Sequence, residues 1–132
     1  MEEVSEFFKE EYEEMKLISE IISNAKIVSP GIFIAASKEE DIITRTVLSK
    51  VAEELLSTKD VQAVFVIGKT SNTEVSVSAR SLNDFNVHII MEAMGGGGHF
   101  SKAATQLQNE TIDHVYEVLE EKVKVFIRDG EI

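Results

Sequence analysis

Four consecutive glycines, Gly95 to Gly98, stand directly before His99. Each glycine loses more backbone entropy on folding than any other residue and packs no side chain, so a run of four indicates close approach to the backbone. Backbone N–H groups in such a loop converge on an anion, and the imidazole of His99 can donate to a phosphate oxygen. The segment therefore predicts a phosphate-binding loop. A flexible surface loop between two helices is the alternative that these residues leave open.

Arg80 is a second candidate for phosphate chemistry. It ends a segment in which polar and apolar residues alternate, so that Ser76, Ser78 and Arg80 share one face of a strand. A planar guanidinium suits bidentate contacts to phosphate, and serine hydroxyls add donors. An exposed arginine beside solvated serines is the competing interpretation. If the sheet brings Arg80 close to Gly95–His99, the two segments form one anion site.

No catalytic or metal-ligating pattern accompanies these candidates. The chain has no cysteine, and Lys102 follows Ser101 instead of preceding a serine as it does in a Walker loop. Neither a Gly-x-Ser-x-Gly elbow nor a His-Glu-x-x-His pair occurs. We interpret His88 and His114 as structural or solvated side chains. From its residues alone, the chain is a binding domain.

The elements that must position these residues follow from periodicity and turn chemistry. An apolar stripe predicts a first helix over residues 2–25, and Ser37-Lys38-Glu39-Glu40 has the form of a capping box that opens a helix running to about Ser57. Thr111 is a plausible N-cap for the last helix. The remaining expected elements are strands at 31–37, 61–68, 74–80 and 104–108, a helix at 84–94 and a helical turn at 99–104. This order predicts an α/β fold with a mixed β-sheet flanked by helices, in which 61–68 and 74–80 pair as an antiparallel hairpin.

Composition and charge narrow the ligand. With 132 residues, 43% apolar and 28% charged, the chain is expected to form one soluble domain. Its net charge is −11, but the acidic excess lies in residues 1–20 and 110–132, whereas residues 21–59 are neutral. Long nucleic acid is an unlikely ligand because phosphate contacts dominate such binding. No membrane span or signal peptide is evident, and we expect a cytoplasmic location.

Ser78-Ala79-Arg80-Ser81 and Gly95-Gly96-Gly97-Gly98-His99, followed by Ala103-Ala104, are recognisable together. Residues 61–120 resemble the C-terminal, substrate-binding lobe of DHH-family phosphoesterases. They look closest to the GdpP-like branch, which hydrolyses cyclic di-AMP to linear pApA. The resemblance implies that Gly95, Gly96, Gly97, Gly98 and His99 bind phosphate, that Ser78 and Arg80 grip the substrate, and that Asn86 is a further contact.

The same resemblance implies an N-terminal lobe that holds two manganese ions and an Asp-His-His motif. No such motif occurs here; the nearest string is Asp113-His114-Val115. We therefore expect residues 1–25 to be a connector helix and residues 26–132 the DHH-associated domain of an excised fragment. This fragment should contain no cofactor, bind cyclic di-AMP or pApA, and be inactive without the N-terminal DHH lobe of its parent chain. In longer members of this family, membrane helices lie upstream, and the resemblance leaves open whether the parent is membrane-anchored.

Two other functions stay open. The first is the corresponding lobe of an oligoribonuclease or a RecJ-like exonuclease. The second is a non-catalytic nucleotide-binding or assembly module that associates through its acidic first helix. Phe7, Phe8 and Tyr12 lie close together on that helix, and exposure of such a surface would favour a homodimer.

Overall fold

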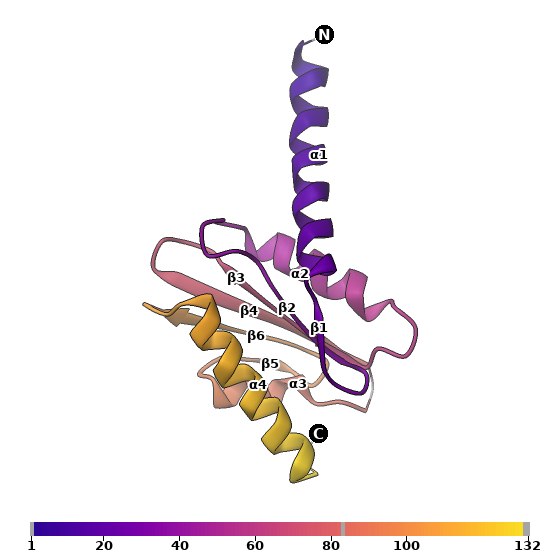
Figure 1. Ribbon diagram of the computed structural model, residues 1–132, viewed down its shortest axis with the longest axis vertical. Helices are drawn as coiled ribbons and strands as arrows, with labels where there is room; N and C mark the ends of the chain where they lie inside the picture. The colour runs from indigo at the N-terminus through magenta and orange to yellow at the C-terminus, as the bar shows by residue number, and fades with distance from the viewer. Residues whose placement is uncertain (1, 83, 131–132) are drawn as a thin grey trace.

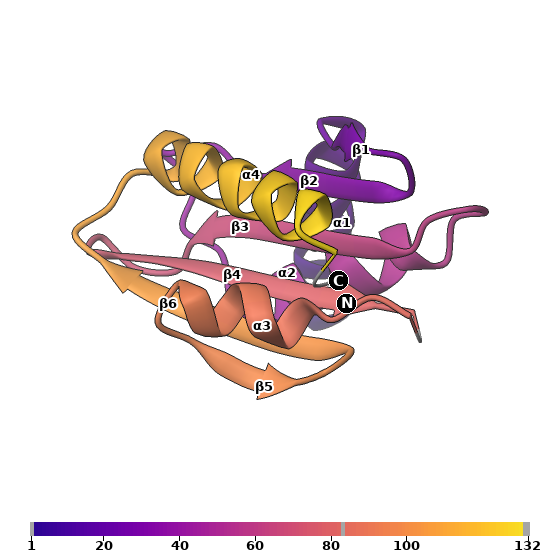
Figure 2. The same ribbon diagram turned by 90° about the horizontal axis from the view of Figure 1, so that it is seen from below.

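The computed structural model describes residues 2–82 and 84–130, which form a six-stranded sheet flanked by helices on both faces (Figures 1 and 2). Strands β2 and β3 are parallel and every other neighbouring pair is antiparallel, so the predicted mixed α/β sheet is confirmed. The strand order is β1-β2-β3-β4-β6-β5. In chain order the elements are α1 (Glu2–Ser23), β1 (Lys26–Ser29), β2 (Ile32–Ala36), α2 (Arg45–Leu56), β3 (Ala63–Lys69), β4 (Glu74–Ser81), α3 (Val87–Ala93), β5 (Gly97–His99), β6 (Lys102–Gln108) and α4 (Ile112–Arg128).

The two faces of the sheet have separate apolar cores. Helices α3 and α4 cover one face, where Phe65 and Leu119 are fully buried. Helix α2 covers part of the other face, and the end of α1 packs beside it through Ile21. Figure 2 shows α3 and α4 on the near side of the sheet and α2 behind it. The predicted hairpin of β3 and β4 is confirmed, since Val64 pairs with Arg80.

The capping box predicted at Ser37–Glu40 is wrong. Helix α2 begins at Arg45, and the hydroxyl of Thr44 caps it by accepting from the backbone N–H of Val47 at 3.1 Å. Residues 37–43 instead form a turn anchored to β3 at both ends, because the backbone N–H groups of Ser37 and Ile43 donate to carbonyls at Ile67 and Lys69. Pairing with an existing strand satisfies these backbone groups without a helix.

The helical turn predicted at His99–Ala104 is also wrong. His99 ends β5 and Lys102 begins β6, so these residues form a tight antiparallel connection. The backbone N–H of Ser81 donates to the carbonyl of Ser101, which ties the connection to the end of β4. Gly97 and Gly98 therefore lie in an edge strand, and the expected convergence of a loop and a helix N-terminus is absent from this part of the described structure.

The two ends of the chain fold largely as their patterns indicate. Thr111 caps α4 by accepting from the backbone N–H of His114, as predicted. The first helix ends at Ser23, and the short strand β1 that follows it was not anticipated. Figure 1 shows α1 projecting away from the sheet, with the N-terminus at its far end.

Candidate phosphate-binding site

A pocket of about 300 Å³ opens where α2 stops covering the sheet. Helix α2 lies over β3 and β4, whereas the outer strands β6 and β5 present exposed side chains on the same face. The register places Ser78 opposite Ala104 and Arg80 opposite Lys102, so the pocket runs along the polar face of β4. Its lining consists of Arg45, Ser49, Ser76, Val77, Ser78, Arg80, Gly97, Gly98, His99, Lys102, Ala103, Ala104 and Gln106.

The guanidinium of Arg80 is the most unusual group in this pocket. Arg80 is only 8% exposed, yet it forms no ion pair with any described carboxylate. Its Nη1 donates to the carbonyl of Ala79 at 2.9 Å and its Nη2 donates to Ser49 Oγ at 3.0 Å. Its Nε is buried without a hydrogen-bond partner. Buried charges are normally paired, so this arginine is poised to receive an anion.

The pKa of Arg80 also reflects its burial. Burial lowers this pKa from its ordinary value, and the negative charge of Glu53 partly opposes that shift. The lowered pKa means that burial penalises the charged form of Arg80. An anion bound beside the guanidinium would remove that penalty, because an opposite charge favours the charged form.

Three of the four glycines have a structural reason to be glycine. Gly95 has φ +85°, and Gly98 has φ +142° with Ala103 packed against it. A Cβ on Gly96 would lie 2.1 Å from the carbonyl oxygen of Ala104. Gly97 differs: its φ is not in the left-handed region, and a Cβ there would meet no atom within 4 Å. Since Gly97 lines the pocket, such a Cβ would occupy ligand space.

The structure brings together only part of the predicted site. Ser78, Arg80, Gly97, Gly98 and His99 all line the pocket. Gly95 and Gly96 do not; their N–H groups donate to the carbonyls of Glu92 and Met91 and so end α3. Asn86 also lies outside the lining, and its side chain caps α3 by accepting from the backbone N–H of Ile89 at 3.3 Å.

Sequence reasoning missed four polar lining residues: Arg45, Ser49, Lys102 and Gln106. Arg45 and Ser49 are spaced i, i+4 on α2, which places them on one helix face. Lys102 and Gln106 lie four residues apart on β6 and so share a sheet face. The predicted helix to Ser57 already contained the first spacing, whereas the wrong helical turn at 99–104 concealed the second.

Arg45 is held at the rim of the pocket by Glu74. Its Nη2 donates to both carboxylate oxygens of Glu74, at 3.1 and 3.3 Å. The hydroxyl of Thr70 donates to the same carboxylate at 2.6 Å, and Gln108 Nε2 donates at 3.2 Å. These hydrogen bonds, with Thr70 contributing most, lower the pKa of Glu74 to about 2. Glu74 therefore stays ionised, and Arg45 stays paired.

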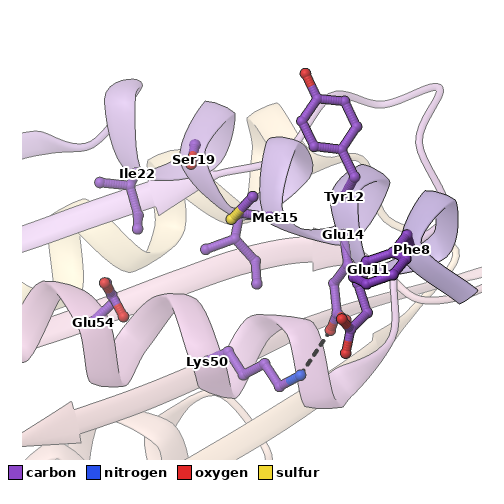
Figure 3. Close-up of a pocket in the computed structure, with 10 residues that line it drawn as sticks. Phe8, Glu11, Tyr12, Glu14, Met15, Ser19, Ile22, Lys50 and Glu54 are labelled. Carbon is purple, nitrogen blue, oxygen red and sulfur yellow. Dashed lines mark hydrogen bonds and ion pairs between the residues drawn. The ribbon is translucent and has the colours of Figure 1, made fainter.

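A second, wider groove of about 800 Å³ lies between α1 and α2 (Figure 3). Its floor is apolar, with Met15 and Ile22 facing α2, and Lys50 Nζ crosses it to Glu14 Oε1 at 2.9 Å. Phe8 and Tyr12, which also line the groove, are more than half exposed. This groove lacks a buried cation, so its chemistry suits an apolar contact surface and not a phosphate.

Two kinds of feature are absent from the described residues. No three or more His, Asp and Glu side chains are grouped so that they could hold a metal ion. No helix combines the length and apolar character needed to cross a bilayer.

Comparison with known families then identifies the fold. Residues 25–125 match the sequence profile of the DHHA1 domain. The chain belongs to the DHHA1 domain family. The match includes every residue that lines the pocket of about 300 Å³ and begins two residues after the end of α1.

Two curated relatives place this DHHA1 domain more narrowly. Over 112 residues it is 38% identical to the cyclic-di-AMP phosphodiesterase GdpP of Geobacillus thermodenitrificans (strain NG80-2), covering 85% of this chain and 17% of that protein. Over 109 residues it is 38% identical to the cyclic-di-AMP phosphodiesterase PdeA of Listeria monocytogenes serotype 1/2a (strain 10403S), covering 83% of this chain and 17% of that protein. The chain thus spans about one sixth of the length of each relative.

A solved structure shows the same fold. An exopolyphosphatase-related protein from Bacteroides fragilis superposes with a TM-score of 0.67 at 16% sequence identity, covering 86% of this chain and 34% of that one. At this identity the similarity extends to the DHHA1 architecture alone.

Proposed function

We propose that this DHHA1 domain is the substrate-binding part of a cyclic-di-AMP phosphodiesterase. In this proposal Arg80 and Ser78 bind one phosphate of the dinucleotide, while Gly97, Gly98 and His99 close over it from the edge strand. Both curated relatives described above act on cyclic di-AMP by name. The observation that carries the proposal is the buried guanidinium of Arg80, which has no described carboxylate partner. Arg80 lines the same pocket as Gly97 and Gly98 of β5.

The size of the pocket supports a half-site. Ligand pockets usually measure roughly 300 to 1,000 Å³, so 300 Å³ lies at the lower limit. It suits one nucleotide better than a whole dinucleotide. The second nucleotide and the scissile bond would then lie outside the pocket, toward an N-terminal DHH lobe of the parent protein that supplies two manganese ions and hydrolyses the substrate to pApA.

The first test is a titration of the isotopically labelled protein with cyclic di-AMP and pApA, followed by NMR. We expect amide shifts centred on Ser78–Arg80 and Gly97–Ala104, and their loss in Arg80→Ala and His99→Ala. The control is Arg128→Ala, which removes an exposed arginine at the end of α4. Shifts that survive Arg80→Ala unchanged would overturn the proposal.

A companion assay addresses catalysis by the isolated chain. We expect no pApA to form when the protein is incubated with manganese and cyclic di-AMP, because no metal site is found among the described residues. Formation of pApA that scales with protein concentration would contradict this expectation and would place hydrolysis within the chain.

An exonuclease of the RecJ type is the weaker alternative. Single-stranded nucleic acid is held by a positively charged groove that follows the backbone. Here the cations converge on one small pocket, and the net charge of the chain is −11. We therefore expect oligonucleotides longer than two residues to compete poorly with pApA in the same titration.

We also propose that the exposed apolar face of α1 packs against the N-terminal DHH lobe in the parent protein and that the isolated chain self-associates through it. Phe8 and Met15 are 63% and 59% exposed, and soluble monomers rarely leave such a patch uncovered. Light scattering tests this. We expect the wild-type protein to have a mass above that of a monomer, and the double variant Phe8→Glu, Met15→Glu to have a lower mass. A wild-type mass equal to that of a monomer, or a mass that the double variant leaves unchanged, would refute self-association through this face.

A further inference from the structure

Two arginines line the pocket of about 300 Å³, and they are held by partners of different charge. The guanidinium of Arg45 is paired with the carboxylate of Glu74, which Thr70 keeps in place and which stays ionised. Arg80 instead donates from Nη2 to the neutral hydroxyl of Ser49 at 3.0 Å. Arg45 therefore offers little net charge to an anion, whereas no described carboxylate compensates the charge of Arg80.

Ser49 lies on a tightly packed segment of α2. Its neighbours Leu48, Val51 and Ala52 are fully buried in the core between α2 and the sheet. Protein interiors of this kind are close-packed, so α2 has a fixed position over β3 and β4. The hydroxyl of Ser49 is therefore an acceptor at a defined place beside Arg80.

Ser49 and the backbone of β4 together set the orientation of the guanidinium. The carbonyl of Ala79 accepts from Nη1 at 2.9 Å, and Ser49 Oγ accepts from Nη2 at 3.0 Å. The donors of an arginine lie in one plane, so contacts made by two different nitrogens fix that plane. The Nε–H stays buried without a described partner. A guanidinium that is ordered before its ligand arrives loses less rotamer entropy on binding.

We infer that Ser49 is a positioning residue: its hydroxyl fixes the guanidinium of Arg80 for a phosphate group and, being neutral, leaves the positive charge available to that phosphate. The inference rests on the proposed function, which assigns the binding of one phosphate to Arg80. A carboxylate at position 49 would fix the same guanidinium but would cancel its charge, as Glu74 does for Arg45. Ser49 acts through Arg80 and not by contact with the ligand.

The experiment is a double-mutant cycle on the full chain, with the affinity for pApA measured by NMR titration. Ser49→Ala removes the acceptor, and we expect the affinity to fall about three- to tenfold because Arg80 must then be ordered during binding. In the Arg80→Met background the same substitution should change the affinity less than about twofold, since residues that act as one unit are not additive. Ser49→Thr keeps the hydroxyl and should restore most of the affinity that Ser49→Ala loses. Thr46→Ala is the matched control, because Thr46 is an exposed residue of α2 outside the pocket.

Ser49→Asp gives a readout that a merely structural role would not produce. A carboxylate at this position should pair with the buried guanidinium, because an uncompensated buried charge is unfavourable. We therefore expect the melting temperature to rise while the affinity for pApA falls more than about tenfold. A packing role for Ser49 would lower both quantities together, and that result would overturn the inference.

The outcomes of the cycle distinguish this inference from the proposed function. If Arg80→Met weakens the binding of pApA but Ser49→Ala does not, the phosphate site stands and the positioning role is refuted. If Ser49→Ala weakens binding equally with and without Arg80, Ser49 contacts the ligand directly and the inference is also refuted. If Arg80→Met leaves the affinity unchanged, the proposed phosphate site fails, and the role of Ser49 fails with it.

Discussion

The two faces of β4 differ more than any other pair of neighbouring surfaces in the protein. On one face Val75, Val77 and Ala79 are fully buried beneath α3 and α4, in a core built from apolar side chains. On the other face Ser76, Ser78 and Arg80 are almost equally buried, but beside α2 and an open pocket. Burial by itself therefore does not distinguish the structural face from the binding face.

The difference lies in how each face satisfies its side chains. The apolar face gains stability from every methyl group that leaves water. The polar face retains a buried guanidinium without a carboxylate partner, which costs stability in the free protein. Such a cost is characteristic of a site prepared for a charged ligand. Substitutions on the first face should change folding, and substitutions on the second should change binding.

Phe65→Ala should have the largest effect. Phe65 is fully buried on the α3 and α4 face and contacts Phe85 edge to face, with ring centroids 6.4 Å apart. Removing a buried phenylalanine costs about 3–5 kcal/mol, because a cavity remains. Urea unfolding should show this loss. The folded fraction of the variant should bind pApA with the same affinity as the wild-type protein. A selective loss of affinity would contradict the separation of the two faces.

Arg80→Met should give the opposite pattern. Methionine fills a similar volume without a charge, so we expect the free energy of unfolding to rise. Charge-assisted hydrogen bonds contribute roughly 1.5–3 kcal/mol, so the affinity for pApA should fall about ten- to a hundredfold. Thermal unfolding and NMR titration measure the two quantities. A large loss of stability would show that Arg80 is a structural residue.

Gly97→Ala should weaken binding with little change in stability. An added methyl group meets no atom of the protein within 4 Å and enters the pocket. We expect a loss of about 1 kcal/mol in affinity for pApA, comparable to the cost of modest overpacking, and an almost unchanged melting temperature. Gly96→Ala sharpens the comparison, since its methyl group would lie 2.1 Å from a backbone oxygen and should instead destabilise the fold. Equal effects of the two substitutions would refute this distinction.

The smallest effect concerns pH. Because the pKa of Glu74 falls from 4.5 to about 2 in the folded protein, its contribution to stability is complete above pH 4.5 and disappears as the pH falls toward 2. Thermal unfolding of Glu74→Gln should lose this part of the pH dependence. A wild-type profile retained by the variant would assign the acid sensitivity to other carboxylates.

Much of the fold could be predicted because its signals are local. The strict alternation of residues 74–80 predicted both faces of β4, and Thr111 was identified as a helix cap from its position before an apolar stripe. The errors have a common cause. Ser37–Glu40 and His99–Ala104 both have helical patterns, but Ser37 donates to the carbonyl of Ile67 in β3, and His99 pairs with Lys102 across a turn between β5 and β6. Tertiary hydrogen bonding overrode local propensity at both places.

The candidate site was predicted in part for the same reason. Arg80, Ser78 and the glycine run were identifiable from residue type, since an arginine among serines and four glycines in succession are both unusual. Their proximity depended on the pairing of β4 with β6 and of β6 with β5, which joins residues about 20 positions apart. The sequence by itself determined the alternating face of β4 and supplied the prediction of a phosphate ligand. Only the tertiary structure decided which glycines serve the backbone, where Asn86 and Arg45 lie, and that Arg80 is buried without a counter-ion, because these properties arise from contacts between segments and not from any segment alone.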